Sequence, residues 1–169
     1  GVIHPVESYW LHWGPAEQTY GVRQQLDEHF QSLTDWLLNG GIDFDFISES
    51  LLPSQCEKAG APLQVGEMAY DAVVVPGCET LRSTTLERLE AFQRAGGRLI
   101  FLGDAPRYAE AKPDERGKRL YEQSRHTEFS REALLDALDQ RVRRAYYSGT
   151  DNDTDFYWYL WVGARSPLF

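Results

Sequence analysis

Six side chains suited to binding or catalysis lie within ten residues near the start of the chain. The segment VIHPVESYWLHWGPAEQ, residues 2–18, holds them directly after a short apolar run: His4, Glu7, Tyr9, Trp10, His12 and Trp13. Carbohydrate sites use flat aromatic faces for sugar C–H surfaces and carboxylates for hydroxyls. Glu7, Trp10 and Trp13 supply both, and they form our candidate carbohydrate site. Alternatively, both tryptophans pack on the following helix or against a neighbouring domain, because Trp is enriched at interfaces.

A second candidate pairs Cys78 with His4. Cys78 follows Pro76 and Gly77 at the end of an apolar run, where a thiol could act as a nucleophile and a nearby histidine could activate it. The alternative is a small buried packing residue. Neither Cys56 nor Cys78 stands in a CxxC or zinc spacing. We therefore expect reduced thiols, a cytoplasmic setting, and neither a metal site nor a cofactor.

Two acidic motifs have simpler explanations. Asp43 and Asp45 flank Phe44 on an expected strand, so both carboxylates point to one face, which fits an ordinary outer face better than acid–base chemistry. The segment 151–155, DNDTD, begins like a calcium loop. Phe156 and Val162 stand where that loop needs Gly and Glu, so a polar turn is the better interpretation.

Length and charge restrict the class of protein. The chain has 169 residues, a size typical of one domain with a hydrophobic core. Its net charge of −9 argues against a nucleic-acid partner. The apolar runs are far shorter than the roughly 20 residues of a membrane-spanning helix, so no membrane contact is expected. The chain opens on Gly1 and its only methionine is Met68, so we expect a piece of a longer multidomain protein.

The hydrophobic pattern predicts alternating strands and helices. Expected strands lie at 2–4, 42–47, 70–77 and 98–103, with two late strands at 141–147 and 155–162. A first helix is expected to begin at Ala16 or Gly21 and to end at Asn39, and two more are expected at 83–95 and 130–138. Thr84 and Glu87 have the spacing of a capping box, and Gly96-Gly97 ends that helix. This order predicts a three-layer α/β/α, flavodoxin-like fold with a mainly parallel sheet and helices on both faces. The late strands would add at an edge, antiparallel.

One stretch of the chain resembles a known superfamily. The segments YDAVVVPGCETL and LERLEAFQRAGGRLIFLGDAP are similar to the middle of the class I glutamine amidotransferase-like fold. Within it, the opening strand followed by ESYW is most similar to the β-galactosidase trimerisation domain of bacterial glycoside hydrolases. The resemblance covers about residues 1–105, and residues 148–169 match nothing in that family. The turn Gly103-Asp104-Ala105-Pro106 lacks the nucleophilic Cys of the amidotransferases, so glutamine hydrolysis is not expected.

This resemblance implies a non-catalytic structural or oligomerisation domain, residues 1–169, of a larger glycoside hydrolase. Its partners would be other domains of the same polypeptide, further copies of itself as a trimer, and a carbohydrate bordering Glu7, Trp10 and Trp13. One alternative is a small hydrolase or amidase that uses Cys78 with His4. Another is a carbohydrate-binding module that uses Trp10 and Trp13.

Overall fold

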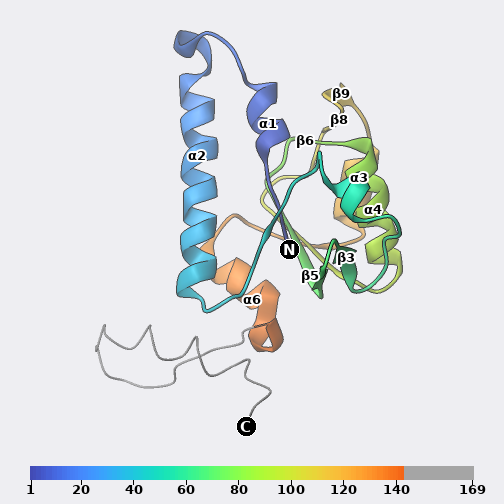
Figure 1. Ribbon diagram of the computed structural model, residues 1–169. Helices are drawn as coiled ribbons and strands as arrows, with labels where there is room; N and C mark the ends of the chain where they lie inside the picture. The colour runs from blue at the N-terminus through green and yellow to red at the C-terminus, as the bar shows by residue number, and fades with distance from the viewer. Residues whose placement is uncertain (143–169) are drawn as a thin grey trace, which may run out of the picture.

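The computed structural model describes residues 1–142, and a five-stranded parallel sheet forms their centre (Figure 1). Its strands are β1 (Val2–Ile3), β2 (Phe46–Ile47), β5 (Ala72–Pro76), β7 (Arg98–Leu102) and β10 (Arg125–Thr127). Their spatial order is β10-β7-β5-β1-β2, and every neighbouring pair is parallel. This is the flavodoxin-like order of a doubly wound sheet, as the sequence pattern predicted.

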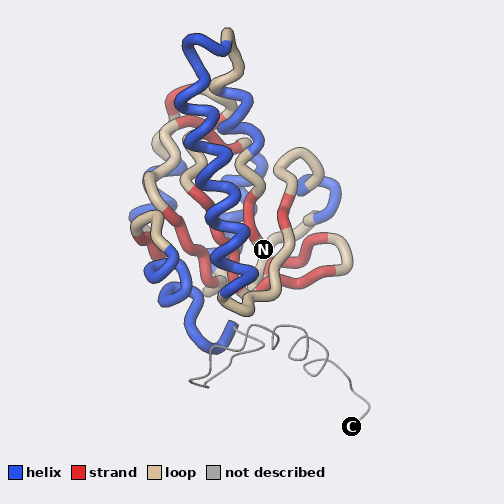
Figure 2. Tube along the Cα trace, turned by 90° about the vertical axis from the view of Figure 1, so that its left-hand side faces the viewer, coloured by secondary structure: helices blue, strands red, loops and turns tan. Residues whose placement is uncertain are grey.

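Helices cover both faces of the sheet. On one face lie α2 (Ala16–Asn39) and α6 (Arg131–Val142), and Figure 2 shows α2 running across the front of the strands. On the other face lie α3 (Leu52–Gln55), α4 (Ser83–Arg94) and α5 (Arg116–Glu122). The sheet therefore separates two apolar cores, and the described residues form three layers.

The two central strands explain why both faces must be covered. All five residues of β5 are buried, and so are the last four of β7. Val73 and Val75 belong to the core under α3, α4 and α5, whereas Val74 belongs to the core under α2 and α6. This alternation follows from the two-residue period of a strand.

Shorter elements lie beside the central sheet. Helix α1 (Val6–Leu11) replaces the loop expected at residues 5–14. The strands β6 (Thr80–Leu81), β8 (Tyr108–Ala109) and β9 (Lys112–Pro113) form a small second sheet. Strands β3 (Leu63–Val65) and β4 (Met68–Tyr70) form an antiparallel hairpin.

The start of α4 differs from the expected capping box. Arg82 is the N-cap residue and makes no side-chain cap, so Thr84 already lies within the first turn. The backbone N–H of Ser83 instead donates to Glu110 Oε1 at 3.0 Å. A carboxylate from a distant turn thus caps α4, where the helix dipole favours negative charge. At the other end of the helix, a Cβ on Gly97 would overlap the ring of Phe92, so only glycine fits there.

Two sequence predictions meet the limit of the described residues. Helix α6 extends to Val142, so the late strand expected from residue 141 begins inside a helix. Three predicted features lie outside the described residues: the remainder of that strand, the acidic motif at 151–155 and the strand expected at 155–162. Among residues 1–142, no helix is long and apolar enough to cross a membrane.

Candidate functional site at the carboxyl edge of the sheet

The strand order reverses between β1 and β5, and polar side chains gather at this point. In doubly wound sheets the connections on the two sides of such a switch point diverge, and ligands bind outside the carboxyl ends of the strands. Here β1 continues into α1, β2 into residues 48–51, and β5 into the turn at Gly77. Gly77 has φ +54°, a conformation that side chains rarely adopt, and it directs the chain toward β6.

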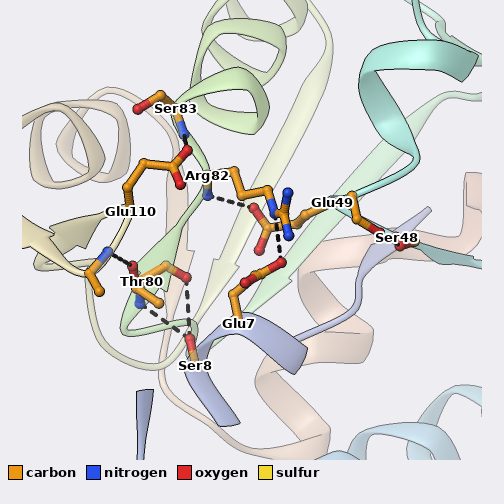
Figure 3. A network of polar contacts seen from close by, with 10 residues as sticks. Glu7, Ser8, Ser48, Glu49, Thr80, Arg82, Ser83 and Glu110 are labelled. Atoms are coloured by element: carbon orange, nitrogen blue, oxygen red, sulfur yellow. Dashed lines mark hydrogen bonds and ion pairs between the residues drawn. The ribbon is translucent and has the colours of Figure 1, made fainter. Parts of the chain in front are cut away.

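Buried hydroxyls connect the segments around this switch point. The Ser8 hydroxyl donates to the backbone oxygen of Thr80 and accepts from its backbone N–H, both at 3.2 Å. The Thr80 hydroxyl in turn accepts from the backbone N–H of Ala111 at 3.1 Å. These bonds link α1, β6 and the β8–β9 turn, as Figure 3 shows. Ser8 is only 1% exposed, so its hydroxyl connects these segments in a position shielded from solvent.

An ion pair spans the same edge. Arg82 Nε donates to Glu7 Oε1 at 2.6 Å, and the two side chains are 34% and 15% exposed (Figure 3). This hydrogen bond raises the pKa of Arg82 above its already high value, so the guanidinium stays charged. We name Glu7, Ser8, Glu49, Thr80 and Arg82 the carboxyl-edge network.

Glu49 is the buried acid of this network. Its side chain belongs to a residue only 1% exposed, and its Oε2 accepts the backbone N–H of Arg82 at 2.8 Å. Its Oε1 has no hydrogen-bond partner among the described residues. Burial raises the pKa of Glu49 to about 7. The backbone N–H of Arg82 and the nearby Thr85 hydroxyl oppose this rise, but the Thr85 hydroxyl lies outside hydrogen-bonding geometry. A carboxyl group that titrates near neutral pH is suited to proton transfer.

A second set of charges lies further out on the same edge. Glu79 follows β5 and contacts a histidine and an arginine: His12 Nε2 lies 2.6 Å from its Oε2, and Arg107 Nη2 lies 2.7 Å from its Oε1. His12 is 29% exposed and Arg107 is 71% exposed. This cluster is therefore more accessible to water than Glu49.

The residues of the predicted carbohydrate site differ in their exposure to solvent. Glu7 points inward to Arg82, whereas Trp10 and Trp13 are 55% and 69% exposed. The guanidinium of Arg23 lies 4.8 Å from the centre of the Trp13 ring and donates to the hydroxyl of Tyr9. Trp13 thus lies in part against α2 through Arg23, and most of its ring surface stays exposed. A sugar contact at the exposed tryptophan faces stays a prediction.

The structure places Cys78 and His4 in unreactive surroundings. The Cys78 thiol is 1% exposed and lies 3.8 Å from the backbone oxygen of Pro76. Burial, and then the negative charge of Glu49, raise the pKa of this thiol well above its usual value. The ring of His4 packs edge-on against Phe30 and Phe46, and burial lowers its pKa. A thiolate nucleophile is therefore disfavoured, because the thiol stays protonated and shielded.

Sequence reasoning missed Glu49, Glu79 and Arg82. Each stands within six residues after a strand that ends at the switch point, and this position was the available signal. The contacts join residues that are distant in sequence: Glu49 and Arg82 are 33 positions apart, and Glu7 and Arg82 are 75 positions apart. Among the described residues, no group of three or more His, Cys, Asp or Glu side chains could hold a metal ion.

The comparisons with known proteins point to phosphatases. A family described as Firmicute fructose-1,6-bisphosphatase matches residues 97–169, less than half of the chain. The class 3 fructose-1,6-bisphosphatase of Ligilactobacillus salivarius is 36% identical over 81 residues, 46% of this chain and 12% of that protein. The class 3 enzyme 1 of Clostridium beijerinckii is 50% identical over 46 residues, 25% of this chain and 7% of that protein. The chain spans only these small shares of the curated relatives, and no solved structure matches.

These matches overturn the resemblance drawn from the sequence. They name fructose-1,6-bisphosphatases and neither an amidotransferase nor a β-galactosidase domain. The assignment to an oligomerisation domain of a glycoside hydrolase was therefore wrong. The two alternatives, a small cysteine-dependent hydrolase or amidase and a carbohydrate-binding module, were wrong as well. The physical reason is that the resemblance relied on a Pro-Gly strand end, a helix and a Gly-Gly turn. Any β-α-β unit needs such features, so they indicate the fold and not the function.

The matched segment is part of the central sheet. Its described portion, residues 97–142, begins just before β7 and supplies β7, β10, α5 and α6. Strand β7 pairs with β5 in register from Ala72↔Arg98 to Pro76↔Leu102. Residues 97–142 therefore depend on residues 1–96 for one of the two neighbours of β7 and for part of both hydrophobic cores.

Proposed function

We propose that the chain takes part in the hydrolysis of a phosphate ester of a sugar bisphosphate, as a portion of a protein related to the class 3 fructose-1,6-bisphosphatases. The observation that carries this proposal is the match of residues 97–169 to that family, together with curated relatives named for that activity. Because the chain spans 7% and 12% of two of those relatives, the complete activity would need residues beyond it.

Within this proposal, residues 1–96 support the matched segment. They supply β5, the neighbour of β7, and the buried side chains Val73, Val75 and Phe92 that pack in the same core as Phe101. The carboxyl-edge network then fixes α1 to β6, beyond the end of β5, the neighbour of β7. A rigid sheet edge of this kind holds polar groups in place for a substrate.

A binding and turnover measurement on the full chain tests the proposal. Calorimetric titration with fructose 1,6-bisphosphate should give saturable binding, and fructose without phosphate should give none. Phosphate release is measured in parallel, with Mg²⁺ or Mn²⁺ present. Absence of both saturable bisphosphate binding and phosphate release would refute the proposed function.

A cytoplasmic setting and self-association are further proposals. Both cysteines are free thiols, which suits a reducing compartment. Trp10 and Trp13 expose apolar rings that could meet a second copy of the chain. Sedimentation of the wild type and of a Trp10→Ala, Trp13→Ala variant tests self-association: an oligomer lost in the variant supports it, and a monomeric wild type excludes it.

A further inference from the structure

We propose that a groove between α4 and α5 binds a small phosphate ester, a site separate from the carboxyl-edge network. The groove has a volume of about 190 Å³. We name it the α4–α5 groove. It is lined by Glu90, Gln93, Arg94, Arg116, Arg119, Leu120 and Gln123. Three arginines and one glutamate thus line one small space in a chain whose net charge is −9.

Two of the three arginines form no ion pair among the described residues, and Arg119 acts on Asp114 only through its charge, which helps to lower the pKa of that carboxyl. Arg116 is neutralised by Asp114, which lies 3.1 Å away, and it also donates to the Ser83 hydroxyl. Among the described residues, neither Arg94 nor Arg119 forms an ion pair: Arg94 Nε donates only to the backbone oxygen of Glu90 at 3.2 Å, and no hydrogen bond is found for the Arg119 side chain. Both of these side chains are exposed. Their donors are therefore available to a ligand.

The remaining lining residues fit a polar ligand with an anionic end. The Gln93 amide donates to the backbone oxygen of Gln123 at 3.0 Å and so joins the ends of the two helices. The Gln123 side chain can meet hydroxyl groups, and the buried Leu120 contributes an apolar surface. Guanidinium groups bind phosphate oxygens in a fixed two-donor geometry. A phosphate carried by a small polyol or sugar combines the charges and hydroxyls that this lining can bind.

Helix polarity offers a competing explanation. Arg94 and Arg119 lie in the last turns of α4 and α5, where a positive charge compensates the partial negative charge of the helix end. That role accounts for about half an elementary charge at each helix, whereas each guanidinium carries a full one. If helix compensation were the only role, their removal would lower stability and leave phosphate binding unchanged.

Titration of the full chain with three probes distinguishes these possibilities. The probes are glucose 6-phosphate, inorganic phosphate and glucose, followed by calorimetry or by amide chemical shifts. We expect saturable binding of glucose 6-phosphate, at least as tight as that of inorganic phosphate, and none of glucose. Binding should weaken below about pH 6, where the phosphate takes up its second proton. Binding of inorganic phosphate alone would overturn the assignment to an ester, and equal binding of glucose would overturn the role of the phosphate.

Matched variants locate the site. The Arg94→Gln, Arg119→Gln double variant should weaken glucose 6-phosphate binding at least tenfold. The control is Arg131→Gln, which removes an exposed arginine of α6 outside the groove and should change binding less than twofold. Circular dichroism verifies that each variant is folded. Unchanged binding by the double variant, or an equal loss in the control, would overturn the site. Because the readout is binding of a monophosphate, its outcome is independent of whether the chain turns over a bisphosphate.

Discussion

The carboxyl-edge network and the α4–α5 groove both contain arginine and glutamate, but they balance these charges differently. In the network, Arg82 and Glu7 form an ion pair, and Glu49 accepts a backbone N–H in a buried position. In the groove, Arg94 and Arg119 line an open space and form no ion pair among the described residues. Paired and buried charges contribute mainly to the fold, whereas exposed and unpaired charges remain available for a ligand. Substitutions in the two regions should therefore change different observables.

The largest effect is expected from Glu49→Gln. The pKa of Glu49 rises from 4.5 to about 7 on folding, so the folded state holds this proton more tightly than the unfolded state. The stabilisation from the protonated group is complete below pH 4.5 and is lost as the pH rises through about 7. The glutamine cannot ionise and can still accept the Arg82 N–H through its side-chain oxygen. Relative to the wild type, the variant should therefore gain roughly 3 kcal/mol of unfolding free energy between pH 4 and pH 9.

Urea unfolding at a series of pH values measures this difference. The control is Glu87→Gln on α4, which makes the same substitution at an exposed glutamate. Its difference from the wild type should vary little with pH. A difference for Glu49→Gln that does not depend on pH would mean that the buried carboxyl does not titrate as its surroundings imply.

A smaller loss is expected when the Glu7–Arg82 ion pair is broken. Arg82→Met leaves the Glu7 carboxylate, only 15% exposed, without its partner. Removal of one partner from a fully buried pair costs 3–5 kcal/mol, so about 2 kcal/mol is expected for this partly exposed pair. A double-mutant cycle with Glu7→Leu should give a favourable coupling of about 1 kcal/mol. Additive single losses would show that the two side chains act independently.

The sequence was sufficient for most of the central fold. Runs such as Ala72–Pro76 and Arg98–Leu102 are apolar on both faces, so they predict buried parallel strands. Helix α2 spans Ala16–Asn39, the longer of the two predicted extents. Strand β10, Arg125–Thr127, was missed because it is a short polar edge strand, and only its pairing with β7 makes it a strand. Local patterns cannot reveal an element that long-range hydrogen bonds define.

The candidate sites were harder to predict for the same reason. Glu7 was singled out for a surface role, but its partner Arg82 lies 75 positions away and turns it inward. Glu49 looks like an ordinary polar loop residue in the segment ISES, and only the fold buries it. The arginines of the α4–α5 groove come from two helices, so neither helix alone predicts the groove.

A loss of stability smaller than that of Arg82→Met is expected from Glu79→Gln, at the outer rim of the carboxyl edge. Glu79→Gln removes the charge that binds both His12 and Arg107, in a cluster that water reaches. Because exposed ion pairs contribute about 0–1 kcal/mol, the expected loss is roughly 1 kcal/mol for the two contacts. Salt at 0.5 M should reduce the difference further, since it screens exposed charges. A loss of several kcal/mol that salt leaves unchanged would place Glu79 with the buried network instead.

The smallest change in stability is expected from Arg119→Gln in the α4–α5 groove. Its side chain is exposed and makes no ion pair among the described residues, so the unfolding free energy should change by less than about 0.5 kcal/mol. A ligand that binds only the folded state raises the melting temperature in proportion to its occupancy. Glucose 6-phosphate should therefore raise the Tm of the wild type and of Arg82→Met, and raise it less for Arg119→Gln. A Tm increase that is lost in Arg82→Met but kept in Arg119→Gln would reverse the comparison and place the anion site at the carboxyl edge.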